Sequence, residues 1–360
     1  MPKPISEQVI VITGASSGIG LATAFAAART GAKVVLAARN ADDLNRAVET
    51  IRRDGGQAIA VPTDVTQYEQ VEALARQAHD TFGRIDTWVN NAGVSAYARF
   101  TDLALEDVRQ VMKTNFLGQV HGAKAALPYL AQSAGALICV GSTLSDRGVP
   151  LQSIYSASKH AIKGWLDSLR VELWEEGSPV RVTLVQPSSI NTPLFNKAKT
   201  QLGVMPQPIP PVYDPELAAD AILHAAESNE RNVFVGGAGK LLATAERVSP
   251  KLVDVHQRYK GFAAQRTDWP KSADSPNNLY GPIAHDGGVR GDFLQGAHTR
   301  SPYQAIDTHA VFGSLVAAGA LALTASALNR RGSNHGLAAL MTAGAVAFAG
   351  KALVAVSVQH

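Results

Sequence analysis

The sequence predicts a doubly wound α/β fold around a parallel seven-stranded sheet, followed by a C-terminal extension. Short, β-branched apolar runs alternate with longer segments of helical period between Val9 and Gly236. These runs are apolar almost throughout, which is typical of strands that helices cover on both faces. A glycine-rich stretch directly follows the first run, where a fold of this class passes from its first strand into its first helix.

Seven apolar runs have the length and composition of strands. They cover residues 9–13, 33–38, 57–62, 85–90, 136–141, 180–186 and 232–236. Helical period predicts helices between them, for example over residues 21–30 and 71–82. Seven strands in this alternation complete a sheet, so we expect one domain over residues 1–240.

Composition and charge narrow the class of protein. The formal net charge is only +3 and no basic block stands out, so the sequence argues against a nucleic-acid partner. Cys139 is the sole cysteine, which excludes an intrachain disulfide and fits a reducing compartment. The first residues lack the pattern of a secretory signal. We therefore expect a cytoplasmic domain. The scattered histidines have no ligand spacing, so no metal site is expected.

The stretch TGASSGIG, residues 13–20, has the glycines that a phosphate-binding turn requires. Gly14, Gly18 and Gly20 leave room for the backbone to approach a pyrophosphate at the positive end of the next helix. Their spacing differs from the commoner G-x-G-x-x-G, and a simple tight turn is the alternative interpretation.

The end of the second expected strand bears on the choice of cofactor. A site that prefers NAD usually places a carboxylate there to hold the ribose 2′-hydroxyl. This chain has Arg39 instead, whose guanidinium can pair with a 2′-phosphate. The sequence therefore favours NADP(H) over NAD(H), with a solvated surface arginine as the alternative. Asp64 follows the third strand and is expected either to bind the adenine amino group or to cap the next helix.

Four polar residues form a candidate catalytic group. Tyr155 and Lys159 are four apart at the start of a helical stretch, so they share one face. A nearby ammonium is expected to lower the phenol pKa, which would let Tyr155 exchange a proton with a carbonyl or alcohol. Ser142 ends the fifth strand and could hold the substrate oxygen, while Asn115 could anchor a water linked to Lys159. Taken singly, each also has an ordinary structural interpretation.

Together these motifs resemble the short-chain dehydrogenase/reductase family. TGASSGIG resembles its cofactor loop and NNAG, residues 90–93, its fourth-strand motif. Asn115, Ser142, Tyr155 and Lys159 match its catalytic tetrad, and QPSSINTP, residues 186–193, resembles its segment after the sixth strand. Ser188 departs from the glycine common there. The resemblance covers residues 5 to about 240.

The resemblance implies a Rossmann fold and hydride transfer between a nicotinamide and a carbonyl or alcohol carbon. Tyr155 would be the acid/base, Lys159 would hold the ribose and tune Tyr155, Ser142 would polarise the substrate oxygen, and Asn115 would complete a proton relay. The implied cofactor contacts are Gly14, Ser16, Ser17, Gly18, Ile19, Gly20, Arg39, Asp64, Val65, Asn91, Ala92, Gly93, Tyr155, Lys159, Pro187, Ile190 and Thr192. A catalytically weak NADP-binding scaffold or a membrane-organising protein is the alternative function.

The substrate is less well defined by the sequence. Its walls are expected from residues 94–97, from residues 149–151 and from a proline-rich segment over residues 193–213. That segment is apolar at its ends and resembles a mobile lid, which favours a lipophilic small molecule.

The C-terminal third is expected to be an extension of the finished domain. Residues 241–307 are interpreted as a helix followed by a Gly- and Pro-rich linker or lid, and residues 308–360 as an apolar helical hairpin. The run over residues 311–328 would extend for about 27 Å as a helix, marginal for a hydrocarbon core of about 30 Å. Small residues recur four apart, and Arg330 and Arg331 join the two runs. Membrane association through residues 311–358, as a transmembrane or shallow hairpin, and a homo-oligomer contact therefore both remain open.

Overall fold

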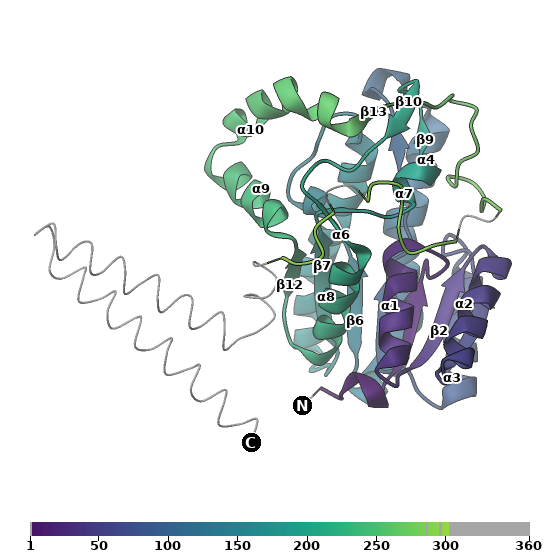
Figure 1. The fold of residues 1–360 in the computed structure, drawn as a ribbon. Helices are drawn as coiled ribbons and strands as arrows, with labels where there is room; N and C mark the ends of the chain where they lie inside the picture. The colour runs from purple at the N-terminus through teal and green to yellow at the C-terminus, as the bar shows by residue number, and fades with distance from the viewer. Residues whose placement is uncertain (1, 285–286, 295–296, 302–360) are drawn as a thin grey trace, which may run out of the picture. The chain divides into compact units, whose positions relative to one another are not determined.

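The computed structural model describes residues 2–284, 287–294 and 297–301. Seven strands form its central sheet in the order β12-β7-β6-β4-β1-β2-β3, and all neighbours are parallel (Figure 1). The predicted fold class is confirmed in this sheet. The strands are β1 (Val9–Thr13), β2 (Lys33–Ala38), β3 (Gln57–Pro62), β4 (Thr87–Asn90), β6 (Ala136–Val140), β7 (Arg181–Pro187) and β12 (Asn232–Val235).

Helices cover both faces of the sheet, as the apolar strands require. Strand β1 is buried throughout, and its side chains alternate between two apolar clusters. Ile10 and Ile12 pack beneath α1 (Gly18–Arg29), α2 (Ala41–Arg53) and α8 (Pro215–Glu227). Val11 packs beneath α3 (Tyr68–Phe82), α5 (Gly118–Ser133) and α6 (Ser153–Glu175). Helix α4 (Leu105–Met112) continues through a π-helix, Lys113–Leu117, into α5.

The proline-rich segment expected as a lid is tied to the rest of the domain by short strands. It contains α7 (Leu194–Lys197), β9 (Lys199–Thr200), β10 (Val204–Pro206) and β11 (Val212–Tyr213). Strand β9 pairs with β5 (Ala96–Tyr97), β11 with β8 (Ser189–Ile190), and β10 with β13 (Arg266–Pro270). Each end of this segment is therefore anchored beside the carboxyl edge of the sheet.

The helix expected at the start of residues 241–307 is broken. Helix α9 (Gly237–Val248) ends at Ser249, and α10 (Pro250–His256) starts with a proline at its first position. Proline lacks the N–H of a continuing helix and disfavours helical geometry in the residue before it. Ser249 accordingly has φ −153° and ψ 82°. A second π-turn, Gln257–Gly261, and a 3-10 turn, Ala263–Gln265, follow.

The compact unit that contains the sheet extends over Met1–Arg300. The described residues after β13, which are 271–284, 287–294 and 297–300, therefore belong to the same compact unit as the Rossmann fold. The helical hairpin expected over residues 308–360 lies outside the described residues. Among the residues described, the helices are too short or too polar to cross a bilayer.

Candidate active site

The turn from β1 into α1 is built so tightly that glycine is required. Gly14 has φ +68°, and a Cβ there would lie 2.8 Å from the Cα of Ala92. A Cβ on Gly20 would lie 2.4 Å from the carbonyl oxygen of Gly14. Both distances are too short for any side chain. Only glycine therefore allows the backbone of the turn to pack this closely against Ala92 and against itself at the start of α1.

The NNAG motif fixes this turn from the neighbouring strand. The Asn91 amide donates to the carbonyls of Thr13 at 3.0 Å and Gly14 at 3.2 Å. The Asn90 amide donates to the carbonyl of Gln119 in α5 at 2.9 Å. The motif therefore joins the end of β4 to the glycine turn on one side and to α5 on the other.

A single cavity of about 850 Å³ lies along the carboxyl ends of the strands. It brings together most of the residues singled out from the sequence. Those lining it are Gly14, Ser16, Ser17, Gly18, Ile19, Arg39, Asp64, Val65, Asn91, Ala92, Gly93, Ser142, Tyr155, Lys159, Pro187, Ile190 and Thr192. Gly20 and Asn115 are outside the lining, because Gly20 packs against Gly14 and Asn115 is fully buried.

The lining fits an extended dinucleotide. Gly14 and Gly18 of the glycine turn line the cavity at the start of α1, and Arg39 lines it at the end of β2. The Arg39 guanidinium donates a 2.6 Å hydrogen bond to the carbonyl of Asn278. Asp64 also lines the cavity, while its carboxylate accepts from the amide of Thr66 at 2.9 Å. That bond shapes the turn before α3, whose N-cap is Gln67, so Asp64 is not the N-cap.

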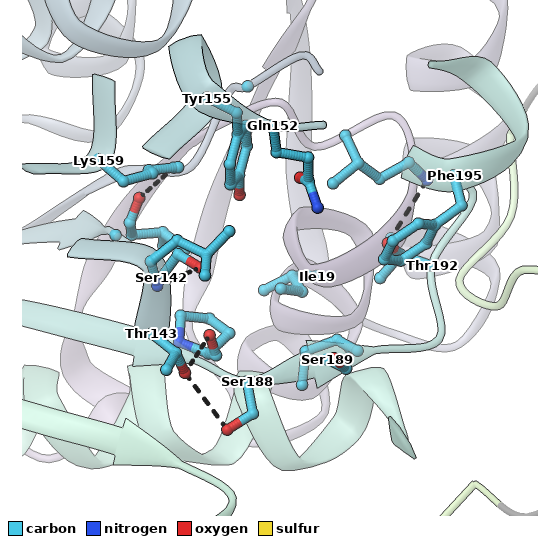
Figure 2. Close-up of a pocket in the computed structure, with 18 of the residues that line it drawn as sticks. Ile19, Ser142, Thr143, Gln152, Tyr155, Lys159, Ser188, Ser189, Thr192 and Phe195 are labelled. Carbon is cyan, nitrogen blue, oxygen red and sulfur yellow. Dashed lines mark hydrogen bonds between the residues drawn. The ribbon is translucent and has the colours of Figure 1, made fainter. Parts of the chain in front are cut away.

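Tyr155, Ser142 and Lys159 come together at one end of this cavity. Tyr155 lies in the first turn of α6, and Lys159 follows one turn later on the same face. Ser142 follows β6, where it caps a 3-10 turn and accepts from the amide of Leu144 at 3.1 Å. Figure 2 shows the Tyr155 ring, the Ser142 side chain and the Gln152 amide directed toward the same space.

The pKa of Tyr155 differs from the sequence-based expectation. Burial raises the pKa of Tyr155 to about 12, and the hydrogen bond from Ser142 opposes the rise only in part. Burial also lowers the pKa of Lys159 to about 8. The Lys159 ammonium donates to the carbonyl of Val140 at 2.8 Å and lies 5.5 Å from the Tyr155 ring centroid. The expected lowering of the phenol pKa is therefore wrong here, because desolvation of the phenolate dominates.

Asn115 supports the site from behind. It lies in the π-helix between α4 and α5 and is fully buried. Its amide accepts from the Val94 amide at 2.8 Å, and it donates to the Val94 carbonyl at 3.0 Å and to the Ser158 hydroxyl at 3.1 Å. Asn115 thus holds the segment after β4 against Ser158 of α6, the residue before Lys159. The π-turn between α4 and α5 is the local distortion that places Asn115.

Comparison with known proteins agrees with this geometry. The family model for short chain dehydrogenases matches residues 8–203. The chain belongs to the short-chain dehydrogenase/reductase family. YxnA of Bacillus subtilis, an uncharacterized oxidoreductase, is 40% identical over 329 residues, which are 90% of this chain and 92% of that relative.

Two solved structures are similar in fold and sequence. An alcohol dehydrogenase from the archaeon Thermococcus sibiricus, complexed with 5-hydroxy-NADP, has a TM-score of 0.56 and 26% identity, and the match covers 63% of this chain and 95% of that chain. A short-chain dehydrogenase/reductase from Burkholderia phymatum in complex with NAD has a TM-score of 0.62 and 26% identity, with 68% and 94% covered. This chain is therefore a NAD(P)-dependent oxidoreductase that acts on CH–OH groups.

Only some of the residues expected to line the substrate site of this dehydrogenase/reductase line the cavity. Val94, Tyr97 and Val149 line the cavity as expected, but Leu151 does not. The proline-rich segment over residues 193–213 contributes residues from α7 and from the loop before β11. Those residues are Leu194, Phe195, Lys197, Gln207, Ile209, Pro210 and Pro211.

A further wall comes from α9 and α10, which the sequence interpretation did not connect with the site. Its apolar members are Leu241, Leu242, Ala245, Val248, Leu252 and Val253, with His256 and Gln257 beyond them. The periodicity of apolar residues over 241–253 predicts a helix with one apolar face. It does not show that this face lines a cavity formed by residues much earlier in the chain.

Ser188, where the family commonly has glycine, connects this wall to the sheet. Its hydroxyl accepts from the Gly239 amide at 3.1 Å and donates to the Gly236 carbonyl at 3.3 Å. Thr143 bonds the same hydroxyl at 3.4 Å, as Figure 2 shows. Ser188 is not among the residues with positive φ, so the departure from glycine strains no backbone and instead adds an anchor for α9.

Lys197 is another cavity residue that the sequence interpretation missed. It is 6% exposed, and its ammonium donates to the Ser17 hydroxyl at 2.8 Å beside the glycine turn. Among the side chains that the structure describes, no group of three His, Cys, Asp or Glu could hold a metal ion.

Proposed function

We propose that this protein interconverts a lipophilic carbonyl compound and its secondary alcohol with NADP(H), and that Tyr155 is the acid/base. One observation carries the proposal. The Tyr155 and Ser142 hydroxyls face a cavity that also contains the glycine turn and a long apolar wall. The proposed proton donor, cofactor site and substrate site thus share one enclosure.

The chain's own groups support proton transfer at the substrate oxygen. The bound cofactor supplies or accepts the hydride at the substrate carbon. With a pKa of about 12, the Tyr155 phenol stays protonated near neutral pH and can donate to a carbonyl oxygen. The Ser142 hydroxyl orients that oxygen beside the phenol. With a pKa of about 8, Lys159 keeps much of its charge near neutral pH and stabilises the phenolate left after transfer.

Positive charge at the adenosine end supports a preference for NADP(H). Strand β2 ends at Ala38 and is followed by Arg39 and Asn40, so the usual carboxylate for a ribose 2′-hydroxyl is replaced. Arg39 brings a guanidinium to the cavity at this position. A 2′-phosphate gains charge-assisted hydrogen bonds from such groups, while a 2′-hydroxyl gains little.

The apolar walls support a lipophilic substrate. Leu241, Val248 and Leu252 line the cavity and are also 70–80% exposed on α9 and α10. Ile209 and Pro210 face the same cavity from the proline-rich segment. Transfer of an alkyl chain from water to such walls contributes about 0.8 kcal/mol for each buried methylene.

Oxidation of NADPH and NADH with a series of alkyl ketones and aldehydes of rising chain length tests the function. We expect turnover with NADPH to exceed turnover with NADH, and kcat/KM to rise with chain length. Tyr155→Phe should lower kcat by more than about a hundredfold while NADPH still binds. Equal turnover by Tyr155→Phe would sink the mechanism, and a flat chain-length series would sink the lipophilic substrate. NADPH binding without turnover of any carbonyl would instead favour the scaffold alternative.

A further inference from the structure

The residue at the start of α6 carries a side chain that does not serve the helix. Gln152 is the N-cap of α6, and its side chain makes no capping hydrogen bond. Ser, Thr, Asp and Asn are the side chains that usually cap a helix, and glutamine is not among them. The preceding residue, Leu151, has φ +66°, a left-handed conformation that is unfavourable for leucine. Departures of this kind from local preference are typical of functional sites.

A buried glutamine from a distant part of the chain orients the Gln152 amide. Gln265 is 0% exposed, and its amide nitrogen donates to the carbonyls of Pro150 at 2.9 Å and Gly261 at 2.7 Å. A carbonyl only accepts, so both hydrogens of this nitrogen are used and the Gln265 Oε1 faces Gln152 as an acceptor. It accepts from the Gln152 Nε2 at 2.7 Å. The two carbonyls thus determine which end of the Gln152 amide is oxygen.

The amide oxygen of Gln152 is left for a ligand. Gln152 is 7% exposed and lines the cavity. Within the described part of the chain, no group donates a hydrogen bond to its Oε1. Figure 2 shows the amide beside the Tyr155 ring and the Ser142 side chain, facing the same space. An acceptor in this position gains most from a bound molecule that donates a hydrogen bond to it.

The reacting oxygen of the substrate is not the group that this acceptor binds. A carbonyl oxygen takes its hydrogen bonds from donors, here the Tyr155 and Ser142 hydroxyls. The Gln152 Oε1 only accepts, so it requires a second substrate group that carries an O–H or N–H. Gln152 and Tyr155 are three residues apart at the start of α6, and their side chains are directed to one space. The second group therefore lies close to the reacting carbon.

The charges around the cavity favour a neutral donor at this place. Asp64, which follows β3, is the sole carboxylate among the described residues that line the cavity. Lys159 places an ammonium 5.5 Å from the Tyr155 ring centroid. A substrate ammonium beside Gln152 would lack a counter-charge and would lie near a like charge. A hydroxyl meets the Gln152 acceptor without that cost.

We propose that the Gln152 amide oxygen accepts a hydrogen bond from a hydroxyl on the carbon next to the reacting carbon, so that the enzyme acts on α-hydroxy carbonyl compounds and vicinal diols that carry an apolar chain. The proposal rests on the proposed interconversion of carbonyl and alcohol. On reduction, the carbonyl carbon receives the hydride of NADPH and the carbonyl oxygen receives the Tyr155 proton. The hydroxyl at Gln152 is unchanged, so the product is a vicinal diol.

Three ketones of equal chain length test the proposal. They are an unsubstituted alkyl ketone, its α-hydroxy derivative and the methyl ether of that derivative. The ether keeps the electron-withdrawing oxygen beside the carbonyl but cannot donate a hydrogen bond. The ratio kcat/KM is measured with NADPH for the full-length protein, for Gln152→Met and for Gln77→Met. Methionine keeps the unbranched shape of glutamine, and Gln77 is exposed on α3, so Gln77→Met is the matched control.

We expect kcat/KM of the hydroxy ketone to exceed that of its methyl ether by about tenfold or more, because the ether leaves the amide oxygen without a partner. Gln152→Met should bring the two values to within about twofold of each other, mainly by a loss with the hydroxy ketone. Gln77→Met should keep the preference of the unmodified protein.

The outcomes separate this proposal from the reaction on which it rests. If neither NADPH nor NADH reduces any of the three ketones, the proposed reaction is wrong and the role of Gln152 is lost with it. If the ketones are reduced but the unmodified protein treats hydroxy ketone and ether alike, only the role of Gln152 is overturned. A preference that Gln152→Met retains, or an equal loss with all three ketones, overturns it as well. The comparison in the unmodified protein needs no variant, so it carries the test if Gln152→Met does not fold.

Discussion

The ammonium of Lys159 donates a 2.8 Å hydrogen bond to the main-chain carbonyl of Val140 at the end of β6. Lys159 is only 3% exposed, and the pKa of its ammonium falls to about 8 because burial removes water from the charge. A carbonyl offers a hydrogen bond but no opposite charge, so the bond compensates only part of that loss. The residue therefore destabilises the folded protein at neutral pH while it serves the site.

Replacing this lysine should stabilise the protein and remove its activity. At pH 7, Lys159→Met should raise the free energy of unfolding by about 3 kcal/mol, because the shift of the lysine pKa from 10.5 to about 8 is a cost of folding. Below about pH 8 both folded and unfolded states are protonated and the cost is complete. It shrinks between about pH 8 and pH 10.5, where the unfolded state binds more protons. Urea unfolding at pH 7 and pH 10 checks this, and an equal or lower stability at pH 7 contradicts it.

Carbonyl reduction should slow as the pH rises through about 8. Lys159 loses its charge there, and the phenolate that forms at Tyr155 then lacks its neighbouring cation. Tyr155 stays protonated over the same range because its pKa is about 12. The profile of kcat between about pH 6 and about pH 10 should therefore show one descending limb near 8. A profile flat to pH 10 would exclude Lys159 as the titrating group.

The sequence was sufficient to predict the sheet because its signals are local. The expected strands over residues 9–13, 33–38 and 57–62 agree residue for residue with β1, β2 and β3. The glycine turn and the pair Tyr155 and Lys159 were also identifiable, since helix periodicity and strand ends define where they lie. Their common place on one cavity follows from the parallel sheet, which collects the carboxyl ends of all strands at one edge.

What sequence reasoning missed depends on contacts between distant segments. The pKa of Tyr155 depends on how deeply the phenol is buried, which no spacing of residues reveals. Arg39 and Asn278 are 239 positions apart, and the residues around Asn278 have no periodicity that would connect them with β2. Ser188 was identified only as a departure from the family, yet its bond to Gly239 holds α9 against the site. Contacts of this kind cannot be predicted from a local sequence pattern, because they join residues that are far apart in the chain.

Cys139 should be unreactive in the folded protein. Its thiol is 0% exposed in the middle of the sheet, and burial raises its pKa to about 12. The thiolate, which is the reactive form, is therefore nearly absent near pH 8. A thiol-specific reagent should label less than about a tenth of the native protein in an hour and one thiol per chain after denaturation. Full labelling of the native protein with retained cofactor binding would show that the thiol is accessible.

Loss of the Ser188 hydroxyl should loosen the wall formed by α9. Ser188→Ala removes the acceptor of the Gly239 amide and should lower the free energy of unfolding by about 1 kcal/mol. It should also raise the KM of long alkyl ketones more than that of short ones, because α9 supplies Leu241 and Val248 to the cavity. Ser6→Ala, at an exposed position, is the control and should change stability by less than about 0.5 kcal/mol. An equal KM change for short and long ketones would argue against a specific role for α9.

Deleting residues 308–360 should leave the enzyme folded and active. The sheet is complete at β12, and the compact unit that contains the cavity ends at Arg300. The truncated chain should therefore keep its NADPH dissociation constant and its kcat within about twofold of the full chain. Measuring the two chains side by side, by turnover and by their distribution between soluble and membrane fractions, separates catalysis from attachment. A truncated chain that is soluble but inactive would show that these residues complete the active site.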